Sequence, residues 1–195
     1  MQVPLFPLNT VLFPGGPLPL RIFEPRYLTM VSDCVQQDSP FGVLLIRNGN
    51  ETGLATTHEV GTLARITDWY QGSDGLLGVT AVGLQRFRVI SSLREANGLN
   101  IGNIEVLPDE PATPLPQEYQ SMPDILGGVL DDLGRLYESL ERHMDDASWV
   151  TSRFVEILPI DLEQKQQCLE SGDPAERLRI VQELLDDARL PAWYS

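Results

Sequence analysis

Two hydrophobic patterns divide the chain, one typical of strands and one typical of helices. In the first half, apolar residues alternate with polar ones or gather in short runs bounded by glycine, proline and asparagine, which indicates β-strands. Strands are predicted over residues 18–23, 41–46, 60–70, 76–82, 85–90 and 99–107. Short strands at this spacing predict a small, strongly bent sheet or barrel.

The stretch 4–27, PLFPLNTVLFPGGPLPLRIFEPRY, organises this half of the chain. Its prolines divide the apolar residues into short extended pieces with fixed ends. The segment 13–17, with its paired glycines, predicts a tight corner. Pro25 suits the first turn of a helix, and the apolar spacing that follows predicts a helix over 25–37. The segment 51–58 is predicted to be an exposed loop.

Helical spacing dominates the second half. One apolar stripe steps by three and four and predicts a single long helix: Ile125, Val129, Leu133, Leu136, Leu140 and Met144. A second helix is predicted over 148–158, burying Trp149, Phe154 and Ile157. Capping signals at Asp161 and Asp173 predict two more helices, and Ser171-Gly172 ends the first of them. The inward face of the last helix is predicted to hold Leu178, Val181, Leu184, Leu185 and Ala188.

The two halves meet at a proline-rich segment and differ in charge. Residues 108–116, PDEPATPLP, carry four prolines and predict an extended connector. Residues 1–107 hold nine acids and seven arginines, a net charge of −2, so 108–195 carry the remaining −12 of the total −14. The predicted organisation is a β-rich domain over 1–107, a connector over 108–120 and a helical domain over 121–195.

Several motifs together resemble the Lon substrate-binding domain, the N-terminal domain of the ATP-dependent protease Lon. They are PLFPLNTVLFPG and PLRIFEPRY, then VGTLARI and VGLQRFRV, and then KQQCLESGDPAERL in the helical half. The resemblance covers nearly the whole chain, with the connector and the first long helix matching less specifically. It implies an α+β fold, a PUA-like β pseudo-barrel followed by a C-terminal helical bundle. It also implies a recognition role.

The sequence shows no counterpart of the ATPase and protease motifs of a Lon protease. The sequence has no glycine-rich P-loop followed by lysine. The single lysine, Lys165, stands among glutamines on a capped helix and is interpreted as a solvated surface residue. His58, placed in a loop, and His143 are isolated, so no metal site or cofactor is expected. Cys34 and Cys168 are interpreted as buried, reduced thiols.

Four residues are candidate contacts for an apolar peptide: Phe13, Leu18, Trp69 and Tyr70. Trp69 and Tyr70 are adjacent in a strand and should point to opposite faces, one into the core and one to solvent. Core packing is the more ordinary alternative for all four. Charged residues of the opening stretch are expected to fasten strand to helix: Arg21, Glu24 and Arg26.

We therefore predict a non-catalytic, Lon-type module that binds unfolded or partly folded protein segments, or a partner protein, with its oligomeric state left open. One alternative is a hydrolase that uses surface carboxylates, which predicts a deep pocket with convergent titratable groups. The other is an RNA-binding module, which the acidic charge disfavours. The chain shows neither a signal peptide nor an apolar run of membrane-spanning length, so a cytoplasmic protein is expected.

Overall fold

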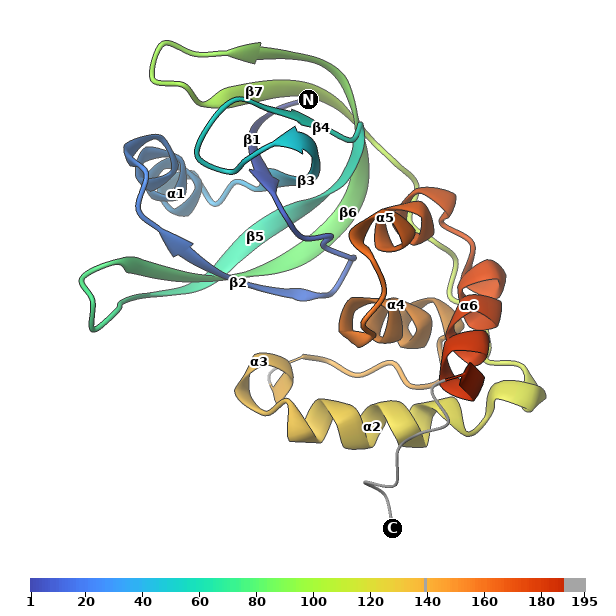
Figure 1. The fold of residues 1–195 in the computed structure, drawn as a ribbon. Helices are drawn as coiled ribbons and strands as arrows, with labels where there is room; N and C mark the ends of the chain where they lie inside the picture. Colours follow the sequence, from blue (N-terminus) through green and yellow to red (C-terminus); the bar gives the residue numbers. More distant parts are fainter. Residues whose placement is uncertain (139, 188–195) are drawn as a thin grey trace. The chain divides into compact units, whose positions relative to one another are not determined.

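The structure is a computed structural model that describes residues 1–138 and 140–187 (Figure 1). The chain forms two compact units, Met1–Asp109 and Glu110–Ser195. The first holds a mostly antiparallel sheet and one helix, and the second is helical. The prediction of a sheet-rich half followed by a helical half is thus confirmed.

The strands of the first unit close into a ring. They are β1 (Gln2–Leu8), β2 (Pro17–Ile22), β3 (Phe41–Gly49), β4 (Ala55–Thr57), β5 (Val60–Gln71), β6 (Leu77–Arg94) and β7 (Asn100–Val106). The sheet order is β1-β7-β6-β5-β3-β4, and β1 also pairs in parallel with β3, so the path returns to its start. β2 lies outside this path and pairs with β6.

Two details of the strands differ from the prediction. Residues 76–82 and 85–90 do not form separate strands but belong to the single strand β6. Gly83 makes the continuation possible, because its bare backbone lies against the Phe13 carbonyl and its N–H donates to the Gly16 carbonyl at 2.9 Å. The segment 51–58, predicted to be a loop, contains β4, which pairs with β3 beyond an irregularity in register.

The helix α1 (Pro25–Gln37) has the predicted bounds and supplies one side of the larger apolar cluster. It ends at Asp38, which adopts a left-handed conformation with φ 46°. The Tyr27 ring stacks on Phe6 with 4.0 Å between centroids. Cys34 lies in the same cluster, and both cysteines of the chain are free and buried, as predicted. Burial raises the pKa of the Cys34 thiol.

A second apolar cluster surrounds Phe87, which is fully buried inside the ring. The aromatic ring fits because glycines stand on β5, which pairs with β6, and on β3, the next strand beyond it. A Cβ atom on Gly42 would lie 2.7 Å from the Phe87 Cζ, and one on Gly61 would lie 3.2 Å from it. Because Gly42 and Gly61 have no side chains, they leave room for the Phe87 ring.

Over residues 110–138 and 140–187, the second unit contains one short 3₁₀ helix and five α-helices. They are η1 (Gln117–Tyr119), α2 (Met122–Asp132), α3 (Arg135–Glu138), α4 (Ala147–Ile157), α5 (Leu162–Ser171) and α6 (Pro174–Asp187). Asp161 and Asp173 cap α5 and α6 as predicted, accepting from the Gln164 and Ala175 N–H groups at 2.8 and 2.9 Å. Gly172 ends α5 with φ 59°. Ala188 lies outside the described residues.

The prediction of one long helix along the Ile125–Met144 stripe is wrong. α2 ends at Asp132, and Gly134 follows with φ 62°, a conformation that interrupts an α-helix. The buried face of α2 is Met122, Leu126 and Leu130, while Leu133 is 45% exposed. These residues form a stripe next to the predicted one on the helix surface, so apolar spacing alone allowed either face.

The burial predicted for α4 was partly wrong. Phe154 is buried, but Trp149 and Ile157 are only partly buried. Val150, Thr151 and Arg153 occupy the interior instead.

A buried ionic network links α4, α6 and the first residue of the second unit. Arg177 is fully buried. Its Nη1 donates to Glu110 Oε1 at 3.0 Å, its Nη2 to Glu110 Oε2, and its Nε to Thr151 Oγ1 at 3.1 Å. The Ser148 hydroxyl also donates to the Glu110 carboxylate. Pairing of this kind is what allows a guanidinium to be buried.

Candidate functional site

The candidate site is the end of a three-stranded ribbon formed by β2, β6 and β5. We call the segments Pro17–Ile22, Leu77–Val82 and Arg65–Gln71 the finger, with β6 in its centre. Leu20 pairs with Val79, and Val79 pairs with Trp69, so the three strands lie side by side, with one register shift in β5 between Ile66 and Asp68. Figure 1 shows the β5–β6 turn projecting beyond the ring strands of the first unit. The finger therefore presents side chains to solvent from a hydrogen-bonded scaffold.

Trp69 and Tyr70 both lie exposed on the finger, with 55% and 57% of their surfaces accessible. The expectation that one of them is in the core is wrong. Strand alternation does place them on opposite faces, but near the projecting end of the ribbon neither face buries its aromatic residue. The Tyr70 ring packs across the strand on Gly78, where a Cβ atom would lie 2.6 Å from the Tyr70 Cε2.

A further aromatic residue at this end, Phe23, was not predicted as a contact. It directly follows β2 and is 56% exposed. Its position was readable, because the strand alternation that turns Ile22 inward turns Phe23 outward. Trp69 and Tyr70 on the finger, and Phe23 directly after its β2 segment, are all exposed aromatic residues.

Phe13 and Leu18 are not part of this exposed set. Phe13 is 1% exposed and lies at the corner before β2. Leu18 is 6% exposed and belongs to the larger apolar cluster. The structure thus separates the four candidate contacts into two core residues and two surface residues.

The charged residues of the opening stretch, Arg21, Glu24 and Arg26, form two separate sets of contacts. Arg26, 8% exposed, pairs with Glu24 at 2.9 Å and donates to the carbonyls of Gly98 and Glu51 at 3.0 and 3.1 Å. It thereby fastens the start of α1 to two loops. Arg21 is separate from them and pairs with Asp74 in the β5–β6 turn. The hydrogen bond from Arg21 and that from the Leu76 N–H hold the pKa of Asp74 below its usual value.

Two residues weighed for chemistry lie in surroundings other than those predicted. His58 is 4% exposed rather than in an exposed loop, and its backbone N–H donates to the Leu45 carbonyl at 3.0 Å. Lys165 is half-buried rather than solvated, and its Nζ donates to the Glu156 carbonyl at 2.7 Å. Burial lowers the pKa of Lys165, and the Glu156 charge opposes that shift. Lys165 thus braces α5 against the end of α4.

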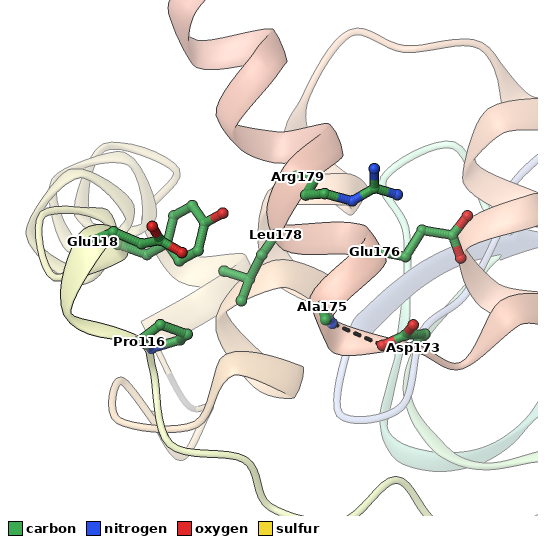
Figure 2. A pocket seen from close by; sticks show the side chains of 8 residues that line it. Pro116, Glu118, Asp173, Ala175, Glu176, Leu178 and Arg179 are labelled. Carbon is green, nitrogen blue, oxygen red and sulfur yellow. Dashed lines mark hydrogen bonds between the residues drawn. The ribbon is translucent and has the colours of Figure 1, made fainter.

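The helical unit contains an open pocket of about 380 Å³ beside the first turn of α6 (Figure 2). Leu178 points into it, with Pro116 and Glu118 on one side and Glu176 and Arg179 on the other (Figure 2). Asp173 contributes to the rim, but its carboxylate is already used to cap α6. The acidic side chains that line the pocket stand around its rim and do not converge on one point. The pocket therefore does not resemble the deep site that a hydrolase would need.

Two further features are absent from the described part of the chain. Residues 1–138 and 140–187 contain no group of three or more His, Cys, Asp or Glu side chains placed to hold a metal ion. Within the same ranges, none of the helices has the length and apolar character needed to cross a membrane.

Comparison with known proteins places the chain among Lon-related domains. The Lon protease 2 of Myxococcus xanthus is 26% identical over 196 residues, a match that covers 96% of this chain and 24% of that protein. Protein cereblon of Xenopus tropicalis is 31% identical over 127 residues, 62% of this chain and 28% of that protein. The chain spans about a quarter of the length of the curated Lon relatives that it matches.

A solved structure gives the same result over the whole fold. A Lon N-terminal domain protein from Xanthomonas campestris matches with a TM-score of 0.77 and 34% identity, covering 94% of this chain and 98% of that one. Residues 2–187 match the family described as the ATP-dependent protease La (LON) substrate-binding domain. The chain therefore belongs to the Lon substrate-binding domain family.

Proposed function

We propose that this chain recognises segments of other proteins and catalyses no reaction itself. The observation that carries the proposal is the exposure of Trp69 and Tyr70 on a finger whose central strand β6 is paired with a strand on each side. Large aromatic side chains on a rigid support contribute much contact area at a low entropic cost, which suits them to protein recognition.

The family supports this reading. Its description is that of a substrate-binding domain in a protease, a role that concerns binding and not bond cleavage. The residues around the finger offer aromatic surface, one exposed ion pair and backbone groups. Such a surface can hold a polypeptide.

Binding to an unfolded client is the direct test. A labelled, reduced and carboxymethylated protein, which cannot refold, would be titrated with the chain and followed by fluorescence anisotropy without nucleotide. We expect saturable binding at micromolar concentrations, and about tenfold weaker binding for Trp69→Ala, because central aromatic contacts dominate such surfaces.

The matched control for Trp69→Ala is Ile90→Ala. Ile90 is 60% exposed on β6, but it lies eleven residues along that strand from Val79, the partner of Trp69. The Ile90→Ala variant should bind the unfolded client with unchanged affinity. Absence of binding up to hundreds of micromolar would reject client recognition, and equal losses for both variants would reject the finger as its location.

We propose that the ring is a PUA-like pseudo-barrel spanning 1–107, with a connector over 108–120 and a helical domain over 121–195. We propose that recognition acts in trans with a separate protease or chaperone. We also propose that it takes place in the cytoplasm, in keeping with two free, buried thiols.

A further inference from the structure

The two lateral edges of the finger are not equivalent. β2 pairs with β6 on one side and β5 pairs with it on the other. β3 covers the outer edge of β5 at Thr62–Ala64. Over the described residues, no strand continues this cover from Arg65 to Gln71. An uncovered strand edge presents a row of N–H and C=O groups to which another strand can pair.

The edge of β2 is closed by prolines. The Gly83 N–H donates to the Gly16 carbonyl at 2.9 Å, so position 16 faces β6. Successive residues of a strand direct their backbone groups to opposite edges, so Leu18, Leu20 and Ile22 also face β6. Pro17, Pro19 and Arg21 then face outward. Because proline has no N–H, only Arg21 can donate from this edge.

The edge of β5 has donors where β2 has prolines. The Gly72 N–H donates to the Leu76 carbonyl at 2.8 Å, so position 72 faces β6. By the same alternation Tyr70 faces β6, while Trp69 and Gln71 face outward. The Trp69 N–H supports this assignment independently, because it donates to the Asp68 side chain at 2.8 Å. The outer edge of β5 therefore offers two N–H groups together with the carbonyls of the same residues.

Asp68 occupies one of these donors from within the chain. Its Oδ1 accepts from the Trp69 N–H, in the way that short polar side chains often satisfy nearby backbone groups. The Asp68 side chain is exposed, so water can solvate its carboxylate when an added strand displaces it. The carbonyl of the added strand would then accept from the Trp69 N–H as one of several ladder bonds, and the strand would lie next to the exposed indole of Trp69.

We propose that the outer edge of β5, from Arg65 to Gln71, binds an extended segment of a client protein as an additional strand. This inference rests on the proposed function and states how the client is held. The segment accepts hydrogen bonds from the Trp69 and Gln71 N–H groups, displaces the Asp68 carboxylate and donates to the outward carbonyls. Alternate apolar side chains of the segment contact Trp69.

An extended strand is the occupant that this edge favours. Beyond the register shift between Ile66 and Asp68, the outward donors and acceptors recur at every second residue, at Trp69 and Gln71, and match the backbone of another strand. A helix, in contrast, keeps its backbone groups internally bonded. The position also follows an existing pairing along the same edge, since β3 pairs with β5 up to Ala64.

The test compares two peptides with the same side chains. The first is an end-capped peptide of about seven residues that alternates valine and lysine. The second is the same peptide methylated on every backbone nitrogen, so that it cannot donate. Binding would be followed by ¹H–¹⁵N NMR of the full chain. We expect the first peptide to slow hydrogen exchange at Trp69 and Gln71 and to bind at least about tenfold more tightly than the second.

The outcomes separate this inference from the proposed function. Equal binding of the two peptides, or binding without protection of Trp69 and Gln71, overturns strand addition but leaves client recognition standing. If neither peptide binds while the unfolded protein does, strand addition is likewise overturned. If neither the peptides nor the unfolded protein bind, both proposals fail. Protection of the two amides that depends on chain concentration without peptide assigns the edge to a second copy and overturns the client assignment.

A protein variant provides a second measurement. Gln71→Pro removes an outward N–H while leaving the groups that face β6, as Pro17 and Pro19 do on the other edge. Gln71→Ala is its matched control, because it keeps the N–H and loses only the side chain. We expect about tenfold weaker binding of the unmethylated peptide for Gln71→Pro and less than about twofold for Gln71→Ala. Equal affinities contradict the proposal, and if Gln71→Pro fails to fold, the peptide pair decides alone.

Discussion

The interiors of the two units differ in the charged side chains that they bury. In Met1–Asp109 the core is largely apolar, and its largest fully buried side chains include Phe41 and Phe87. In the helical unit the largest fully buried side chains are Arg153 and Arg177, each paired with a glutamate. The helical unit also buries apolar side chains such as Leu126 and Phe154, but it combines them with two arginines that need a charged partner. Cavities should therefore damage the first unit most, and unpaired charges the second.

The largest expected effect is that of Phe87→Ala in the ring. Removing this side chain leaves a cavity between strands that carry Gly42 and Gly61, which have no side chains to fill it. We expect a loss of about 3–5 kcal/mol in the free energy of unfolding. Hydrogen exchange followed by mass spectrometry should show faster exchange in β3, β5 and β6. The exposed Phe23→Ala should stay within about 0.5 kcal/mol, and similar losses for the two would contradict this account.

The corresponding change in the helical unit is Glu110→Gln. It keeps the shape of the side chain but leaves the buried Arg177 guanidinium without a carboxylate. We expect a loss of about 3 kcal/mol, seen as faster hydrogen exchange in α4 and α6 with the strands unchanged. Glu118→Gln, an exposed control in the same unit, should have little effect.

A double replacement tests whether the loss of stability comes from the unpaired charge. Glu110→Leu combined with Arg177→Met removes both charges, so neither is left buried and unpaired. Because replacing a buried pair with apolar groups is often neutral, the double variant should be more stable than Glu110→Gln. A double variant that is less stable would show that the network contributes more than the mutual satisfaction of its charges.

A smaller effect should appear at alkaline pH in the helical unit. Burial raises the pKa of Tyr137 to about 12, with the Glu156 charge adding to the rise and Arg153 opposing it. Because the folded value lies above the unfolded value of about 10, the stabilisation is complete below about pH 10 and is lost as the pH rises towards 12. Tyr137→Phe should flatten the decline in unfolding free energy over this window. The unfolding free energy would be measured by urea titration at each pH. If it falls equally steeply with pH in the variant and in the unaltered protein, the assignment is contradicted.

The smallest effect is expected for the exposed ion pair between Arg21 on the finger and Asp74 in the β5–β6 turn. Asp74 has a lowered pKa, so its contribution is present above the unfolded value of about 3.9 and is lost as the pH falls through the lower folded value. Asp74→Asn should change the melting temperature slightly above pH 4 and converge with the unaltered protein at more acidic pH. A difference that persists at the acidic end would point to a role in turn geometry instead of charge.

Local signals in the sequence were sufficient wherever one short segment decides the outcome. The bounds of α1 follow from Pro25 and the polar stop after Gln37. The start of α6 follows from an aspartate cap, and the end of α5 from a glycine in the left-handed conformation. The family resemblance was likewise readable from ungapped motifs and is confirmed by the match over residues 2–187.

The candidate site was only half predictable. Alternation correctly separated Trp69 from Tyr70, but it could not show that the ribbon extends past the core and leaves both exposed. Phe13 and Leu18 resembled contacts in sequence because apolar residues beside a glycine corner look the same in a core and in a binding surface. Which of them is buried depends on strands distant in sequence.

The order of the two halves, the capped helices and the family could be predicted from the amino-acid sequence alone. The single strand β6, the interruption after α2, the burial of Arg177 and the uncovered edge of β5 became visible only in the folded chain. The two groups of features differ in the range of the interactions that produce them. Caps and periodicity act over a few residues, whereas strand pairing and charge burial join positions such as Glu110 and Arg177 that are far apart along the chain.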